Sequence, residues 1–140
     1  MKAFLEKVTL AACNLSRVNL DGVSLAGARL HNVSLEKASF RSAQMEGTQI
    51  DNASMEQADL HEAEIVNALF SDVHLHEARF EGATLLGNTV FRNAPGLTPE
   101  QLSPAAVAPD TELPAPIARV LNLRSEIESI PRRTLGHQEQ

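Results

Sequence analysis

The sequence predicts an all-β solenoid followed by a short α-helical C-terminal segment. Every residue whose number is a multiple of five, from Leu5 to Val90, is apolar, which makes eighteen of eighteen positions. The residue two places before each of them is apolar and small or β-branched, except at Thr48 and Asn88. The chain has 140 residues, of which 43% are hydrophobic, but it contains only five Phe and no Tyr or Trp. This composition is typical of a narrow core filled by Leu, Val and Ala.

The five-residue period excludes the two standard elements. On an α-helix, steps of five residues advance by about 500°, which spreads the large residues around the axis. On a flat strand, odd spacing places alternate large residues on opposite faces. A chain that turns a corner every five residues instead directs the small and the large apolar residue of each unit toward one interior.

Glycine, asparagine and proline are placed as such corners require. All glycines before residue 96, and three asparagines, stand two residues after a large apolar position: Gly22, Gly27, Gly47, Gly82, Gly87, Asn32, Asn52 and Asn67. Both residue types tolerate left-handed turn geometry. Proline is absent before Pro95, which suits coils whose N–H groups pair with the neighbouring coil.

The units carry a family resemblance. Strings such as ADLHE at residues 58–62 and CNLSR at residues 13–17 resemble the A(D/N)LXX unit of pentapeptide-repeat proteins. The resemblance covers residues 3 to 92 and implies a right-handed quadrilateral parallel β-helix with four units per coil. At the usual strand spacing of about 4.8 Å, about 4.5 coils give a rod on the order of 20 Å long. A core filled by side chains leaves no internal pocket for a substrate.

The composition changes at Asn93, which divides the chain into a repeat domain (1–92) and a C-terminal capping segment (93–140). Thr98 is predicted to cap a short helix, with Pro99 at its first position and Gln101 completing a capping box. The string GLTPEQL at residues 96–102 resembles the segment that follows the last coil in this family, which implies that it covers the open end. We expect 103–116 to be irregular, 117–130 to form an amphipathic helix ended by Pro131, and 132–140 to be disordered.

The predicted helix needs a surface on which to bury its apolar stripe. The main large apolar residues in outward columns near the last coils are Val66, Leu69, Leu86 and Phe91. An exposed apolar patch usually has a partner. We therefore expect the tail to pack on these four residues, either within one chain as a monomer or across a homodimer.

Acidic residues dominate the second half of the repeats, and the formal net charge is −6. No Lys or Arg lies between Arg41 and Arg79, and this stretch holds eight outward carboxylates that we call the acidic belt: Glu46, Asp51, Glu56, Asp59, Glu62, Glu64, Asp72 and Glu77. One interpretation is a solvated surface that keeps the rod soluble. The other is an interaction surface for a basic protein.

The resemblance gives the second interpretation a concrete form. Some pentapeptide-repeat proteins imitate duplex DNA, bind DNA gyrase and protect against quinolones, although with longer and more acidic rods. Direct binding of this chain to nucleic acid is disfavoured by its negative charge.

Catalytic and metal-binding patterns are weak. His74 and His76, with Glu77 beside them, share a strand face, but two imidazoles are too few for a metal site. Cys13 lies in an inward column and is expected to be a small buried residue. Neither a Ser-His-Asp arrangement nor a phosphate-cradling glycine loop is present. The sequence therefore predicts no catalytic, cofactor-binding or metal-binding residue.

The single cysteine excludes an internal disulfide. The string LAAC at residues 10–13 resembles a lipoprotein cleavage box, but Glu6 and Lys7 interrupt the apolar run that such a box requires. No apolar stretch has the length of a membrane span. We expect a cytoplasmic, non-enzymatic module or scaffold that binds a protein, with a basic partner among the candidates. The alternative is a DNA-mimicking protein that binds gyrase or another topoisomerase.

Overall fold

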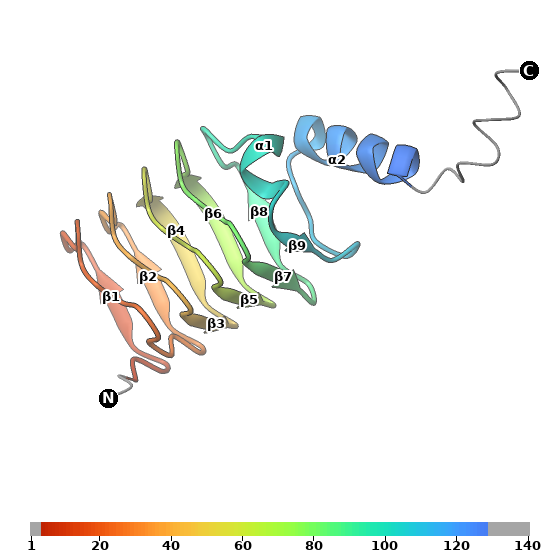
Figure 1. Cartoon of the computed structure of the whole chain (residues 1–140). Coiled ribbons are helices and arrows are strands. Elements are labelled where there is room, and N and C mark those ends of the chain that lie inside the picture. Colours follow the sequence, from red (N-terminus) through yellow and green to blue (C-terminus); the bar gives the residue numbers. More distant parts are fainter. Residues whose placement is uncertain (1–3, 129–140) are drawn as a thin grey trace, which may run out of the picture.

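The chain winds into a right-handed stack of parallel coils, and the computed structural model describes residues 4–128. Up to residue 86, residues paired between consecutive coils are 20 positions apart, as Thr9 and Arg29 are, so each of these coils consists of four five-residue units. Face 1 is a five-stranded parallel sheet (Figure 1) made of β1 (Thr9–Ala11), β2 (Arg29–His31), β4 (Gln49–Ser54), β6 (Leu69–His74) and β8 (Val90–Arg92).

The other three sides follow in chain order as faces 2, 3 and 4. Each corner residue is counted with the face that precedes it in the chain. Isolated bridges hold face 2, for example Asn14 with Ser34, and face 3, for example Asn19 with Ser39. β4 and β6 continue around the corner, so their last residues, Ser54 and His74, lie on face 2. Face 4 is a four-stranded parallel sheet of β3 (Gln44–Glu46), β5 (Glu64–Val66), β7 (Thr84–Leu86) and β9 (Ala106–Val107). The predicted quadrilateral β-helix is confirmed, with about five turns.

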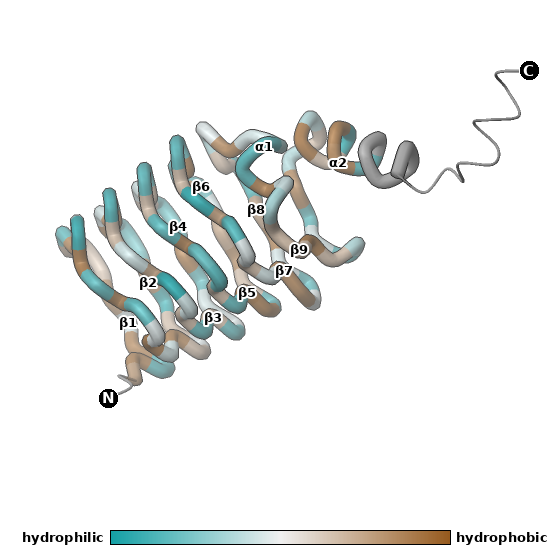
Figure 2. The backbone as a smooth tube through the Cα atoms, in the orientation of Figure 1, coloured by the Kyte–Doolittle hydropathy of each residue, from teal (hydrophilic) through white to brown (hydrophobic). Residues whose placement is uncertain are grey.

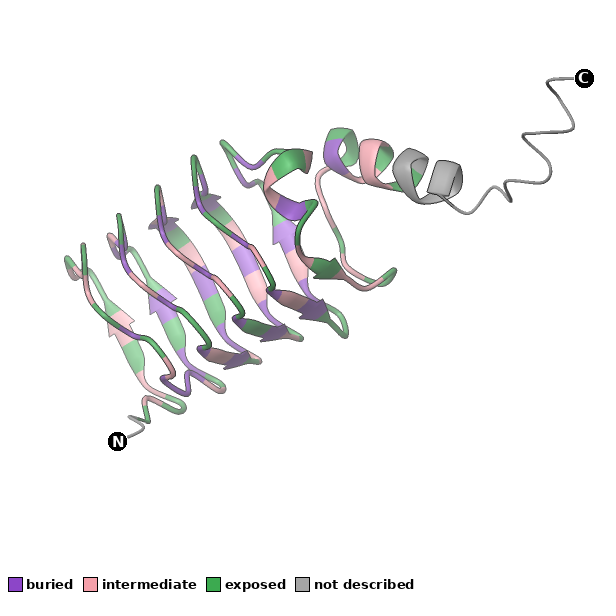
Figure 3. Ribbon diagram, viewed as in Figure 1, coloured by how far each residue is buried: buried purple, intermediate pink, exposed green. Residues whose placement is uncertain are grey.

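The interior is filled by the predicted apolar column. Every fifth residue from Leu20 to Leu85 is buried, whereas Leu5, Leu10 and Leu15 are half-buried because a described coil packs on them from one side only. Figure 3 shows buried residues recurring along the coils between exposed ones, and Figure 2 shows hydrophobic and hydrophilic residues alternating along each coil. The prediction that small and large residues share one interior is confirmed.

The corners are left-handed in every unit. The residue two after each large apolar position, from Lys7 to Gly87, has φ between 52° at Asn52 and 72° at Gly82. Glycine occupies only five of these corners. The N–H of the corner residue donates to a carbonyl of the next coil, at 2.8 Å for Arg17 and Glu36. Inter-coil hydrogen bonding therefore imposes the left-handed conformation on residues of many types.

The register shifts by one residue at the end of the repeats. Phe91, expected to point outward, is 3% exposed and pairs with Phe70, while Val90, expected inside, pairs with Leu69 and is half-exposed. The corner at Gly87 contains one extra residue, so Thr89 takes the inner small position that Asn88 would otherwise occupy. The Thr89 hydroxyl donates to the Leu86 carbonyl at 2.9 Å. The prediction for Phe91 is wrong because the extra residue moves the large aromatic ring inside.

The coil geometry continues past the repeats. β9 pairs with β7, and Val90 forms a bridge with Glu112. The expectation of an irregular segment over 103–116 is therefore wrong at β9 and at Glu112. The sequence there lacks the five-residue pattern, yet its backbone still completes the hydrogen bonds of the coil beneath it.

The capping box is confirmed at α1 (Pro99–Leu102). The Thr98 hydroxyl accepts from the Gln101 amide, and the Gln101 side-chain oxygen accepts from the Thr98 amide at 2.6 Å. The same side chain donates from Nε2 to the carbonyls of Leu75 at 2.7 Å and Ala78 at 2.9 Å. Gln101 thus satisfies the Ala78 carbonyl and adds a second donor to the Leu75 carbonyl, which also accepts from the Ala78 amide at 3.0 Å.

The second helix, α2 (Ala115–Glu128), begins two residues before the predicted helix, and the predicted stop at Pro131 and the tail 132–140 lie outside the described residues. α2 packs against α1 at the end of the stack (Figure 1), where Ile117 is buried and Leu121 is partly buried against the core. For the part of the helix whose side chains are described, packing on Val66 and Leu86 within one chain is therefore wrong, while packing across a homodimer stays a prediction. Over residues 4–128, no helix combines the length and apolarity that crossing a membrane requires.

Candidate functional site

The acidic belt is spread evenly around the rod. Its members fall two to a face: Asp51 and Asp72 on face 1, Glu56 and Glu77 on face 2, Asp59 and Glu62 on face 3, and Glu46 and Glu64 on face 4. A four-sided coil produces this distribution because residues five apart belong to neighbouring faces. No face therefore concentrates the negative charge of the belt.

Most belt carboxylates also have local partners. Asp51 pairs with His31, Asp59 with Arg41, Glu62 with His61, and Asp72 and Glu77 accept from Asn93 and Gln57. Among the described residues, Glu46, Glu56 and Glu64 are the belt members without a side-chain hydrogen bond or ion pair. Two of these three carboxylates, Glu46 and Glu64, lie together on face 4.

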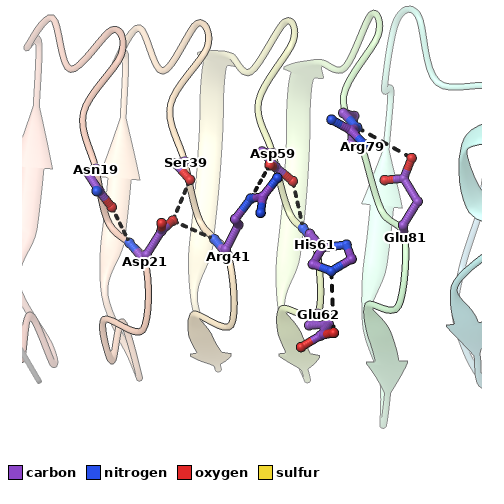
Figure 4. A network of polar contacts seen from close by, with 9 residues as sticks. All are labelled: Asn19, Asp21, Ser39, Arg41, Asp59, His61, Glu62, Arg79 and Glu81. Carbon is purple, nitrogen blue, oxygen red and sulfur yellow. Dashed lines mark hydrogen bonds and ion pairs between the residues drawn. The ribbon is translucent and has the colours of Figure 1, made fainter.

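Face 3 carries a polar network that runs along the rod axis (Figure 4). Asp21 Oδ1 accepts from the Arg41 amide at 2.9 Å and from the Ser39 hydroxyl. Arg41 then crosses to the next coil, where its Nε donates to Asp59 Oδ2 at 2.6 Å. The network joins three successive coils, so these charged groups are used to hold coils together.

The pKa of the Asp59 carboxyl is shifted by its neighbours in this network. Its side chain is 18% exposed. Burial alone would raise the pKa of the carboxyl, but hydrogen bonds from the Arg41 guanidinium and the His61 amide hold the pKa of Asp59 below its ordinary value. The same contact raises the pKa of Arg41. Asp59 therefore remains charged at neutral pH as a structural group.

Residue-level reasoning from the sequence identified Asp59 only as a belt member and missed the rest of the network. A column of positions 20 apart would have placed Asn19, Ser39, Asp59 and Arg79 along one face. It would not have found the contacts that Asp21 and Arg41 make between coils. The same column explains the D/N position of the repeat. The side-chain oxygens of Asn19 and Asp59 accept from the backbone N–H two residues later, at 2.9 and 3.0 Å.

The histidines among residues 4–128 lie on the outer surface. His74 and His76 are both exposed, and His76 Nε2 lies 3.5 Å from Glu77 Oε1. A polar hollow of about 440 Å³ beside His74 is lined also by Asp72, Asn52 and Asn93. Within residues 4–128, no three His, Cys, Asp or Glu side chains are grouped closely enough to hold a metal ion.

The single thiol lies in the first described coil. Cys13 is half-buried, and its Sγ donates to the Ala11 carbonyl at 3.2 Å. It is the small inward residue of its unit, as predicted, but only one coil covers it.

Comparison with known proteins identifies the repeat. The family model for pentapeptide repeats matches eight copies in overlapping stretches at residues 3–41, 13–49, 38–76 and 53–93. No curated protein sequence matches the chain significantly.

Solved structures that the chain is similar to are pentapeptide-repeat proteins. One from the thylakoid lumen of Arabidopsis thaliana is 28% identical, with a TM-score of 0.41 over 66% of this chain and 60% of that one. Rfr23 from the cyanobacterium Cyanothece 51142 is 20% identical, with a TM-score of 0.36 over 80% of this chain and 88% of that one. QnrB1, a plasmid-mediated fluoroquinolone resistance protein, is 13% identical, with a TM-score of 0.38 over 76% of this chain and 83% of that one.

The family match spans residues 3–93, and the coils, left-handed corners and filled core described above belong to the same stretch. The chain is a member of the pentapeptide-repeat family.

Proposed function

We propose that this protein is a non-enzymatic interaction module that holds a protein partner against the outer faces of its β-helix. The observation that carries the proposal is the fixed register of the outward side chains. Pairs such as Glu46 with Val66 and Glu64 with Thr84 recur in parallel register along each face. Side chains at the strand spacing of about 4.8 Å form a rigid, flat surface, which suits contact with another folded surface.

The placement of reactive groups supports binding over catalysis. General acid–base chemistry needs groups that converge on one substrate in a site from which water is excluded. The titratable pairs of this rod, such as His31 with Asp51 and His76 with Glu77, lie apart on exposed faces. In each pair the imidazole and the carboxylate contact each other at the solvent-exposed surface, as in ordinary surface ion pairs.

The alternative function, DNA mimicry toward gyrase or another topoisomerase, rests on the acidic belt. A mimic of duplex DNA presents carboxylates at regular intervals along one side. Here the belt is divided among four faces, and five of its eight members have hydrogen-bond or ion-pair partners. This distribution favours the first proposal.

Site-specific photo-crosslinking tests the proposed function. A photoreactive amino acid is placed at one outward position per face, at Ser71, His74, Arg79 or Thr84, and the full chain is exposed to lysate of the native host. Saturable crosslinking of one protein from one or two adjacent faces is expected. Absence of a saturable protein adduct from all four positions overturns the proposal.

A supercoiling assay separates the two candidates. Micromolar protein is expected to leave gyrase activity and its inhibition by quinolones unchanged. Inhibition of supercoiling, or protection from the drug, would favour the DNA-mimic alternative. A variant carrying Glu56→Gln and Glu64→Gln serves as the matched control, because a charge-based mimic weakens when unpaired carboxylates are removed.

A further inference from the structure

An apolar patch wraps one corner of the rod near its C-terminal coils. We call it the corner patch, and it consists of Val66, Leu69, Leu86 and Val90. Val66 pairs with Leu86 on face 4, and Leu69 pairs with Val90 on face 1. The corner residues between the two faces are Asn67 and Gly87, with φ of 52° and 64°. In Figure 2 the bends after β5 and β7 are coloured hydrophobic, whereas the bend after β3 is hydrophilic.

The register shift completes this patch. It turns the side chain of Phe91 inward and leaves Val90 beside Leu69 on the surface. Leu86 is 45% exposed, and the other three members are half-exposed. The regular repeat places polar residues such as Gln49 and Glu46 at the equivalent positions one coil earlier.

The described part of the tail does not cover the corner patch. α2 packs on α1, and its buried residue Ile117 contacts the core at the end of the stack. Contiguous apolar surface of this kind on a soluble protein marks an interaction site. The occupant must therefore be a separate molecule or a segment with matching chemistry.

The surroundings of the patch define that chemistry. A hollow of about 230 Å³ on face 4 is lined by Glu46, Glu64 and Val66, together with Ser24, Ala26, Gln44 and Met45. Val66 belongs to both the hollow and the corner patch. Glu46 and Glu64 stand on neighbouring strands, and across residues 4–128 neither has an ion-pair partner. Two basic residues lie on the adjoining face 1: Arg92 follows Val90 by two positions, and Arg29 stands in the column of Leu69, two strands away.

We infer that the corner patch and this hollow bind a peptide segment of a protein partner in which a Lys or Arg lies next to at least two apolar side chains. The apolar side chains cover Leu86 and Val66, while the cation enters the hollow between the two carboxylates. Charge-assisted hydrogen bonds set the orientation, and the apolar contacts supply most of the affinity. The inference rests on the proposed function and specifies the class of partner.

Synthetic peptides test the inference on the full chain. The probe is a hexapeptide of alternating leucine and lysine with blocked ends, and the two comparison peptides replace lysine by glutamate or leucine by serine. Nuclear magnetic resonance titration is expected to shift the amides of residues 64–67 and 84–90 with the leucine–lysine peptide. Each comparison peptide is expected to bind at least about tenfold more weakly.

Two variants and one control make the assignment specific. Val66→Ser with Leu86→Ser removes the apolar contacts, and Glu46→Lys with Glu64→Lys reverses the charge of the hollow. Both are expected to weaken binding at least about tenfold. Glu36→Lys with Glu56→Lys makes the same charge change on face 2 and is expected to leave binding unchanged. Circular dichroism checks that each variant is folded.

Three outcomes overturn the inference. The first is peptide binding that both variants retain, and the second is a set of shifts confined to other faces. The third is movement of the same amides with protein concentration alone, which identifies a second copy of this chain as the occupant. If the peptide fails to bind while the crosslinker on another face captures a partner, the docking site is wrong and the proposed function stands.

Discussion

The ring of Phe91 lies on the ring of Phe70 with their centroids 4.6 Å apart and an interplanar angle of 6°. Phe80 meets Phe91 edge to face at 6.3 Å. This three-ring cluster occupies the interior where the repeat register changes. It explains why the chain accommodates an extra residue at the preceding corner and does not continue the five-residue frame.

The cluster predicts a large difference between two adjacent substitutions. Phe91→Ala is expected to lower the free energy of unfolding by about 3 to 5 kcal/mol, because it leaves a cavity against Phe70 and Phe80. Val90→Ala is expected to lower it by about 1 kcal/mol or less, since Val90 is half-exposed. Chemical denaturation measures both. A larger loss for Val90→Ala would show that the uninterrupted five-residue register is the correct one.

Substitutions at two glycines separate backbone conformation from crowding. Gly22 has φ of 68°, and a Cβ atom there meets nothing within 4 Å, so Gly22→Ala is expected to cost about 1 to 2 kcal/mol from the left-handed conformation alone. At Gly96, with φ of 83°, the Cβ would lie 2.7 Å from the His76 amide nitrogen. Gly96→Ala is therefore expected to cost at least about 1 kcal/mol more, because backbone must move. Thermal unfolding measures both losses of stability. Equal losses for the two variants would contradict the close approach of Gly96 to the His76 backbone.

Asp59 predicts a specific pH dependence. Its folded pKa is lowered by Arg41 and the His61 amide, so its contribution to stability is complete above the unfolded pKa of about 3.9. The contribution is lost as the pH falls through the lower, folded pKa. Asp59→Asn is expected to cost about 1 kcal/mol or less at pH 7, because half of the Arg41 side chain is exposed.

That difference should shrink toward zero as the pH falls below about 3. Denaturant unfolding at several pH values measures it. Glu46→Gln is the control, since Glu46 has no ion pair among the described residues and should show little difference at any pH. A difference between wild type and Asp59→Asn that is constant from pH 7 to pH 2 contradicts the assignment.

Gln101 predicts a local loss of order at the capped end. Gln101→Ala leaves the carbonyls of Leu75 and Ala78 and the amide of Thr98 without their side-chain partner. The Leu75 carbonyl still accepts from the Ala78 amide, so a loss of about 1 to 3 kcal/mol is expected for the other two groups, which are left unsatisfied. Hydrogen exchange should accelerate over the last coil and much less at β1 and β2, since each coil contacts only its neighbours. Ser103→Ala, at an exposed side chain, serves as the control, and uniform acceleration over all coils would argue against a local cap.

The sequence predicted the interior and the corners because each position is repeated many times. One pair of apolar residues five positions apart would mean little, but a buried column from Leu20 to Leu85 follows from one rule applied without exception. The corner conformation was predictable from glycine and asparagine, although residues such as Lys37 and Glu62 adopt it too. There the inter-coil hydrogen bonds override local preference.

The shift at the last repeats was not predictable from the pattern. Val90 and Phe91 are both apolar, so either could occupy the inner position, and only the stacking on Phe70 decides between them. Asn88 is a polar residue in a column of small apolar ones, but so is Thr48, after which the register does not change. The outward placement of Val66, Leu69 and Leu86 followed correctly from the frame, since these residues precede the extra residue or adjoin it.

Contacts between coils were also beyond the one-dimensional pattern. The pairing of Arg41 with Asp59 depends on side chains 18 positions apart, and the covering of the last coil by Gln101 depends on how the chain turns after Pro95. Only the four-sided geometry brings these residues together.

The extra residue at Gly87 and Asn88 has a wider implication for how such rods diversify. A corner can accommodate one inserted amino acid, since the strand that follows it still pairs with the preceding coil. The inserted residue does change which side chains point outward: in the units that follow, a different position of each unit faces the solvent. The insertion of one residue at a corner can thus change the outward side chains of a face while the preceding coils keep their structure.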